Sequence, residues 1–157
     1  MRDKTLTVEV GTYKDAKFLC NALKKKGVNF LPRAENVIKG IELSKVKQTL
    51  NLKVKSVKDL GHSTSTQRKV IYEDAAKLGL SKCPADAALC YLLQHGNEMK
   101  IKEILVFAID PYKDSYGDLN LFIVERRSKD DFRLYANSGN SDDYWNSYTQ
   151  FVFVEDL

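Results

Sequence analysis

Apolar residues near the start of the chain recur at the spacing of an amphipathic helix. Between Thr12 and Gly27, the apolar positions that would share one helix face are Ala16, Leu19, Cys20 and Leu23. We expect Thr12 to cap this helix, with Asp15 three residues later completing a variant of the capping box. The lysines at 24–26 suit the carbonyl end of a helix, and Gly27 suits the residue after it. The pattern predicts a helix over 12–27 with Cys20 in the core and no ligand needed to explain the lysines.

Three more helical segments and one strand are expected before residue 97. A short helix is expected at 33–39, and the alternation of apolar and polar residues at 49–57 is typical of a half-buried strand. Ser65 or Thr66 should cap a helix that ends at Gly79. The segment 83–95 begins with Cys83 and a proline and is apolar around most of a helical wheel. A helix of that kind is typically enclosed in a core.

The pattern changes from helix to strand after residue 96. A continuous apolar run covers 103–110, and 119–125 and 132–137 read as a hairpin joined by a charged turn. One more strand is expected at 150–156. The order predicts an α+β fold: helices with one early strand, then an antiparallel meander packed against the helices.

Length and composition indicate one ordinary globular domain over residues 1–157. The chain is 43% hydrophobic and 29% charged, which is enough to build its own core. It has no apolar run of membrane-spanning length, and its first ten residues lack the apolar segment of a secretory signal. The cysteines Cys20, Cys83 and Cys90 match no zinc or redox spacing. We therefore expect a cytoplasmic protein with reduced thiols, no metal, no cofactor and no membrane partner.

Charge is distributed unevenly along the chain. Residues 1–80 contain 17 Lys/Arg and 8 Asp/Glu, whereas residues 81–157 contain 8 Lys/Arg and 13 Asp/Glu. We expect a basic, mainly helical part at about 1–97 and an acidic sheet part at about 98–157. The basic part could bind a polyanion, or each part could simply solvate its own surface.

Cys83 is the one candidate for a reactive thiol. A thiol at a helix N-terminus can have a lowered pKa, but catalysis also requires a nearby base. Along one helix, Cys90 would lie about 10 Å away and His95 about 18 Å away, so neither could pair with Cys83. His62, in a Ser/Thr-rich loop, is the remaining histidine. Cys83 with His62 is therefore a weak catalytic pair, and the apolar helix favours a buried, unreactive thiol.

Residues 140–150 combine aromatic and acidic side chains in a polar loop. The candidate binding residues are Asp142, Asp143, Tyr144, Trp145 and Tyr148. Aromatic residues with a polar group are enriched in recognition surfaces, and rigid scaffolds often carry function on loops. Alternatively, Trp145 folds back and covers one end of the core. The acidic pair argues against a phosphate ligand and favours a basic partner.

Arg68 and Lys69 are the candidates for nucleic-acid binding. Cations near the start of a helix are unfavourable against the helix dipole, and a phosphate bound there would relieve the conflict. However, no aromatic residue interleaves the basic ones as a stacking surface requires. The chain also has no Walker, Rossmann, GxSxG, HExxH or zinc pattern.

From about residue 54 onward, several segments resemble a family of uncharacterised small bacterial proteins. The matching segments are "VKSVKDLG", "IYEDAAKLGLSKCPADAAL", "DSYGDLNLFIVER", "FRLYANSG" and "WNSYTQFVFV". The chain departs from that family after Cys-Pro-Ala, where it has "DAALC" in place of a glutamate followed by glycine and proline. The resemblance implies a similar architecture and a bacterial origin, and it implies no activity, cofactor or site residue.

Three functions remain open at this point. The first is a non-enzymatic domain that binds another protein through the aromatic-acidic loop. The second is a nucleic-acid or other polyanion binder that uses the basic first half. The third is a thiol-dependent enzyme centred on Cys83. The absence of a catalytic constellation favours the first.

Overall fold

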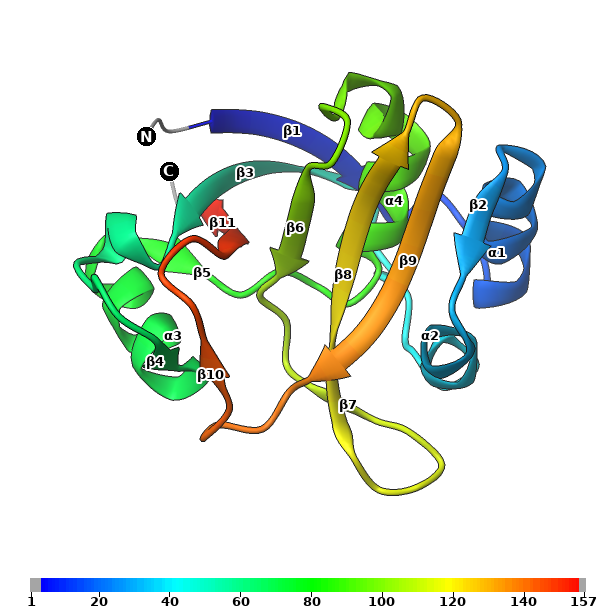
Figure 1. Ribbon diagram of the computed structural model, residues 1–157. Helices are drawn as coiled ribbons and strands as arrows, with labels where there is room; N and C mark the ends of the chain where they lie inside the picture. The colour runs from blue at the N-terminus through cyan, green and yellow to red at the C-terminus, as the bar shows by residue number, and fades with distance from the viewer. Residues whose placement is uncertain (1–3, 156–157) are drawn as a thin grey trace.

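The computed structural model describes residues 4–155. Helices and strands alternate between residues 4 and 98, so the prediction of one early strand is wrong, and from residue 104 onward the regular elements are strands (Figure 1). The α-helices are α1 (Ala16–Lys25), α2 (Pro32–Ile38), α3 (Arg68–Lys77) and α4 (Ala87–His95), with short 3-10 turns η1 (Lys58–Leu60) and η2 (Gly96–Glu98). The strands are β1 (Lys4–Val10), β2 (Val28–Phe30), β3 (Gln48–Ser56), β4 (Thr66–Gln67), β5 (Leu80–Ser81), β6 (Ile104–Phe107), β7 (Tyr112–Lys113), β8 (Leu119–Ser128), β9 (Asp131–Ser138), β10 (Tyr144–Trp145) and β11 (Gln150–Glu155). The chain is an α+β protein.

The main sheet is mixed, so the predicted meander is wrong. Its strand order is β1-β3-β11-β6-β8-β9-β2, with β5 added to β11 and β7 added to β8. The last strand, β11, lies between β3 and β6 and runs parallel to β6, and β2 runs parallel to β9. The predicted hairpin is confirmed as β8 and β9. Pairs joined by a short turn follow the sequence order, whereas β11 pairs with strands that the sequence places far from it.

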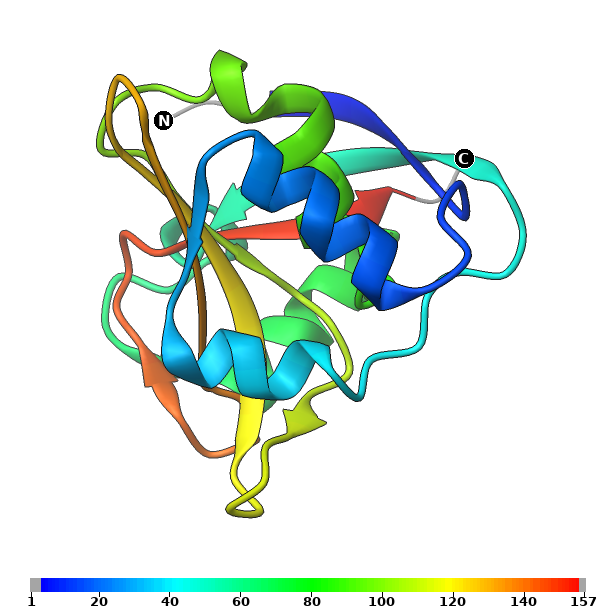
Figure 2. The ribbon, with the colours of Figure 1, turned by 90° about the vertical axis from the view of Figure 1, so that its right-hand side faces the viewer.

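Helices cover both faces of the sheet at β11. Phe153 points to one face, where its ring meets the edge of Tyr72 in α3 with 6.2 Å between centroids. Val152 points to the opposite face together with its cross-strand partner Phe107, whose ring centroid lies 5.6 Å from that of Tyr91 in α4. α1 packs on α4, and α1 and α2 flank β2 (Figure 2). Burial on both faces explains why this strand is continuously apolar.

The prediction that α4 is enclosed in the core is confirmed, but its predicted start is wrong. Every residue from Ala87 to Leu92 is buried. Cys83 lies before the helix in extended backbone, where its N–H donates to the Ala108 carbonyl at 2.7 Å. This hydrogen bond ties the segment to the end of β6, so the helix begins at Ala87, after Pro84.

The predicted caps of two other helices are also corrected. In α1 the N-cap is Asp15, whose carboxylate accepts from the Phe18 N–H at 3.0 Å, and Thr12 lies outside the helix. In α3 the N-cap position is Gln67, and no side chain caps it. Thr66 belongs instead to β4, where it pairs with Trp145. The first two N–H groups of α3 donate instead to the carbonyls of Asp143 and Ser141, which come much later in the chain.

The basic and acidic parts of the sequence are interleaved in space. β11 of the acidic part lies next to β3 of the basic part, and β2 lies next to β9. One connected hydrophobic core contains residues from both parts. Within residues 4–155, none of the helices is both long enough and apolar enough to cross a membrane.

Candidate functional site

The structure brings together two sets of predicted site residues. The segment 140–149, called the aromatic segment below, packs on the start of α3 and adds β10 alongside β4 (Figure 1). The Arg68 N–H donates to the Asp143 carbonyl at 2.8 Å, and the Lys69 N–H donates to the Ser141 carbonyl at 3.1 Å. These two carbonyls accept hydrogen bonds from backbone N–H groups that a helix start otherwise leaves free. A phosphate at the start of α3 would need the same N–H groups.

The charged side chains of the two sets also interact with each other. Lys69 Nζ lies 3.4 Å from Asp142 Oδ1, and both side chains are largely exposed, so this ion pair contributes little stability. Asp143 Oδ2 accepts from the Asn140 N–H at 3.0 Å, which holds the turn within the segment. The Arg68 guanidinium lies over the Tyr72 ring, 4.7 Å from its centroid. Of the four charged side chains, Lys69 and Asp142 meet across the contact, whereas Arg68 is engaged within α3 and Asp143 within the segment.

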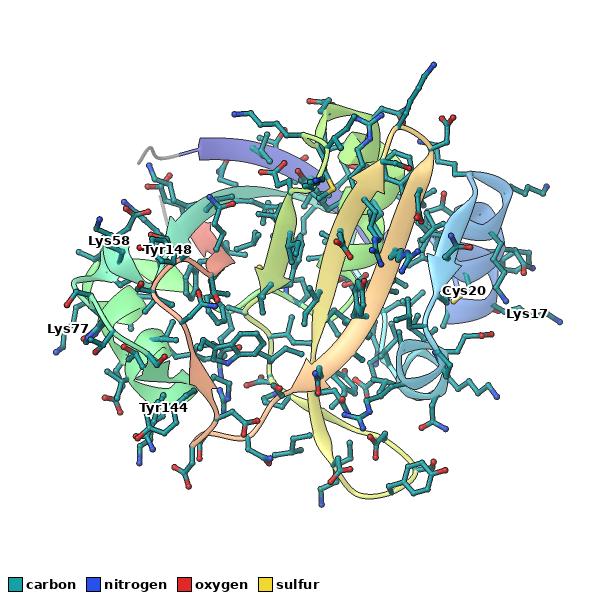
Figure 3. All side chains as sticks on the ribbon, viewed as in Figure 1. Lys17, Cys20, Lys58, Lys77, Tyr144 and Tyr148 are labelled. Atoms are coloured by element: carbon teal, nitrogen blue, oxygen red, sulfur yellow. The ribbon has the colours of Figure 1, made fainter. Side chains whose placement is uncertain are left out.

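The three aromatic residues of the segment point in different directions. Trp145 folds back, and its ring meets Phe151 edge-on with 5.4 Å between centroids. Tyr144 and Tyr148 point outward and are 66% and 81% exposed (Figure 3). The indole therefore anchors the segment to the core, and the two tyrosines form its outer surface.

The end of the aromatic segment is held by a second set of hydrogen bonds. The Val57 N–H donates to the Thr149 carbonyl at 3.0 Å, and the Lys58 N–H donates to the Ser147 carbonyl at 2.9 Å. The side-chain oxygen of Asn146 accepts from the Tyr148 N–H at 3.0 Å. Both ends of the segment are therefore fixed to the body of the protein, and the exposed Lys58 lies near Tyr148.

Cys83 is in an environment that makes a thiol unreactive. Its side chain is buried, and Sγ donates a hydrogen bond to the Val152 carbonyl at 3.4 Å. Burial raises the pKa of this thiol, and it also raises the pKa of Cys90 to about 12, to which the charge of Asp86 adds. A thiolate is needed for nucleophilic attack, so this geometry gives the thiol-enzyme hypothesis no support.

His62, the proposed base for Cys83, has a different partner. Its Nε2 pairs with the carboxylate of Asp74 in α3, and the same carboxylate lies 3.6 Å from Lys77 Nζ. Among the described residues, no hydrogen bond joins His62 to Cys83. Over the same part of the chain, no group of three His, Cys, Asp or Glu side chains is placed to hold a metal ion.

The structure has a hollow between α1, β2 and α2 that the sequence does not predict. It contains Cys20, which is only half-buried, together with Lys17 and Lys24 from the same helix. These residues and Asn21 are spaced i, i+3, i+4 and i+7 from Lys17, which is the spacing of a second stripe beside the core-facing one. That spacing is visible in the sequence, but the apolar stripe accounts for Cys20 and the helix end accounts for Lys24, so the sequence alone does not require a second stripe.

Comparisons with family models, curated proteins and solved structures find no match to this chain. The resemblance to small bacterial proteins therefore stays a prediction.

Proposed function

We propose that this protein is a non-enzymatic binding domain that recognises another protein through the aromatic segment. The observation that carries the proposal is that Tyr144 and Tyr148 are exposed on a segment fixed at both ends. Exposed tyrosines on a rigid support lose little conformational entropy on binding and provide both apolar area and a hydrogen-bonding hydroxyl.

The residues of the segment have different roles in this proposal. Tyr144 and Tyr148 make the contact, and Trp145 keeps them in place by packing on Phe151. Asp142 and Asp143 are engaged by Lys69 and by the Asn140 N–H, so they mainly fix the geometry of the segment. A basic group on the partner could still reach Asp142, whose side chain is 74% exposed.

Site-specific photo-crosslinking tests the proposal. A benzophenone amino acid is placed at Tyr148, or at Tyr116 as the matched control, because Tyr116 is 87% exposed on a different loop. In host lysate, we expect the probe at position 148 to crosslink one discrete protein. The probe at position 116 should not crosslink that protein. The double substitution Tyr144→Ser/Tyr148→Ser should abolish capture of that protein by an affinity-tagged chain, whereas Tyr116→Ser should preserve it. Identical products at both positions would contradict the proposal.

A second candidate is binding of single-stranded nucleic acid by the same surface. The observation that favours it is that Lys58, joined through its backbone to Ser147, lies next to the exposed Tyr148. An exposed ring beside a cation is the combination that single strands use for stacking and phosphate contact. Arg68 and Lys69 would contribute only if they left Tyr72 and Asp142.

Salt dependence separates the two candidates. A fluorescent oligothymidine should bind the chain with an affinity that falls by at least about tenfold between roughly 50 and 200 mM salt if several phosphates are neutralised. Tyr148→Ser should weaken this binding and Tyr116→Ser should not. Absent or salt-insensitive binding would rule out the nucleic-acid candidate.

A further inference from the structure

A second hollow surface lies far from the aromatic segment. It is enclosed by α1, β2 and α2 and has a volume of about 330 Å³. Figure 3 shows Cys20 and Lys17 of this hollow on the opposite side of the molecule from Tyr144 and Tyr148. The volume lies at the lower end of the range for small-molecule sites, roughly 300–1,000 Å³.

The inner surface of the hollow is apolar. Ile38 is buried, and Cys20 and Phe30 are half-buried and pack against the hydrophobic core. Burial raises the pKa of the Cys20 thiol, although the nearby Lys24 charge acts in the opposite direction. Cys20 is therefore a neutral thiol at neutral pH and belongs to the apolar surface.

The rim of the hollow is positively charged. Lys24 Nζ lies 3.5 Å from Glu35 Oε2 and 5.6 Å from the centre of the Phe30 ring, so its charge is partly compensated. Lys17 and Lys39 also line the hollow and are exposed. Over residues 4–155, neither of these two lysines forms an ion pair. An apolar floor is thus bordered by two uncompensated cations.

We propose that this hollow binds a small organic anion with an apolar body, such as an aromatic carboxylate or sulfonate. The apolar body would cover Phe30, Ile38 and Cys20 and release water from them. The acidic group would lie at the rim near Lys17 and Lys39. Inorganic phosphate would leave the apolar floor of the hollow hydrated. A neutral aromatic molecule would leave both lysines without an anionic partner. Neither should bind as well as a molecule that carries both parts.

Cys20 provides a direct readout of occupancy. Cys83 and Cys90 are buried, so Cys20 is the most accessible thiol of the native chain. N-ethylmaleimide should therefore modify Cys20 first, and peptide mass spectrometry identifies the modified residue. A molecule bound in the hollow covers the thiol and slows its alkylation.

The experiment uses the whole chain and two dyes of nearly the same shape. Anilinonaphthalene sulfonate carries an acidic group, and N-phenyl-1-naphthylamine has the same rings without it. We expect the sulfonate to bind and to slow alkylation of Cys20, and the neutral dye to protect Cys20 less. Lys17→Gln/Lys39→Gln should weaken sulfonate binding by about fivefold or more, the effect of removing two exposed charge contacts.

The matched control is Lys77→Gln/Lys129→Gln, which removes the same charge from lysines outside the hollow. This variant should bind the sulfonate as the unmodified chain does. Three results would overturn the proposal: sulfonate fluorescence without protection of Cys20, equal protection by the neutral dye, or equal weakening in both double variants. The test involves no residue of the aromatic segment, so its outcome is independent of the function proposed above.

Discussion

At the scale of single residues, Asp86 is a buried carboxylate that joins two distant parts of the chain. It is only 2% exposed and occupies the N-cap position of α4. Its two carboxylate oxygens accept from the Ser44 N–H at 3.0 Å and from the Ser44 hydroxyl at 2.9 Å. Asp86 therefore joins the connection between α2 and β3 to the start of the core helix. The positive end of α4 favours its negative charge.

Substitution at Asp86 should cost more stability than substitution at its partner. Asp86→Ala leaves the Ser44 N–H without an acceptor and removes two hydrogen bonds to a charged group, a loss of about 2–3 kcal/mol. Ser44→Ala removes only the hydroxyl contact, a loss of about 1 kcal/mol. Urea unfolding followed by circular dichroism measures both. Equal losses in the two variants would show that the carboxylate does not organise this connection.

The sequence indicates the position of Asp86 but not its partner. A carboxylate just before an apolar helix is a local pattern, and it predicts a position near the amide end of that helix. Ser44 lies 42 residues earlier in the chain, and no local periodicity connects the two. For the aromatic segment too, the sequence indicates a position but not the contact partners. Its composition predicts a surface loop, but its contacts with Arg68 and Lys69 depend on how the chain folds back.

At the scale of elements, the edge strand β1 is protected by the end of α4. The Glu9 N–H donates to Gln94 Oε1 at 2.9 Å, and Gln94 Nε2 donates to the Glu9 carbonyl at 2.8 Å. His95 Nε2 lies 2.6 Å from the Thr7 carbonyl oxygen. One side-chain amide thus makes both hydrogen bonds that a neighbouring strand would make. This arrangement blocks pairing with a second chain at that point of the edge.

Gln94→Ala should therefore open the β1 edge locally. We expect amide hydrogen exchange at Glu9 to accelerate by about fivefold or more, which corresponds to losing roughly 1 kcal/mol of hydrogen bonding. Glu9→Ala is the matched control, because it keeps the backbone groups that Gln94 contacts and should leave exchange at that position protected. Gln94→Glu can accept but cannot donate, so its effect should fall between the two. NMR hydrogen exchange distinguishes the three variants, and unchanged exchange in Gln94→Ala would contradict this account of the edge.

The elements that the sequence predicted well are those whose signal is local. Residues close together in the sequence predict each of three features. These are the apolar stripe of α1, the apolar circumference of α4 and the β8–β9 hairpin. β1 also has a local signal, since Leu6, Val8 and Val10 alternate with polar residues. That local pattern is enough to indicate a strand, and the structure gives its bounds as Lys4–Val10. β2 has three residues, too few for any periodicity, and only its pairing with β9 defines it.

At the scale of the whole molecule, the core contains several ionisable groups that stay neutral when folded. Burial is the largest cause of the raised pKa of Cys83, Cys90, Tyr72 and Tyr91. The four residues come from α3, from α4 and from the segment before α4, so they report on the packing of both helical layers against the sheet. In the unfolded chain each group would ionise near its ordinary pKa.

Folding stability should therefore fall as the pH rises above about 9. The unfolded chain then loses protons that the folded chain keeps, so the stabilisation is complete below the ordinary pKa values and decreases with rising pH. Between pH 8 and pH 10, each buried cysteine should account for a loss of roughly 1.5–2 kcal/mol, and the tyrosines, with a higher ordinary pKa, for less. The double variant Cys83→Ala/Cys90→Ala is expected to be less stable at pH 8, but its unfolding free energy should decrease by roughly 3–4 kcal/mol less over this interval than that of the unmodified chain. Urea titrations at the two pH values give the slope of unfolding free energy against pH for the unmodified chain and for the double variant. Parallel slopes would mean that the two thiols ionise in the folded chain as they do in water, and the tight packing of α4 against the sheet would then be incorrect.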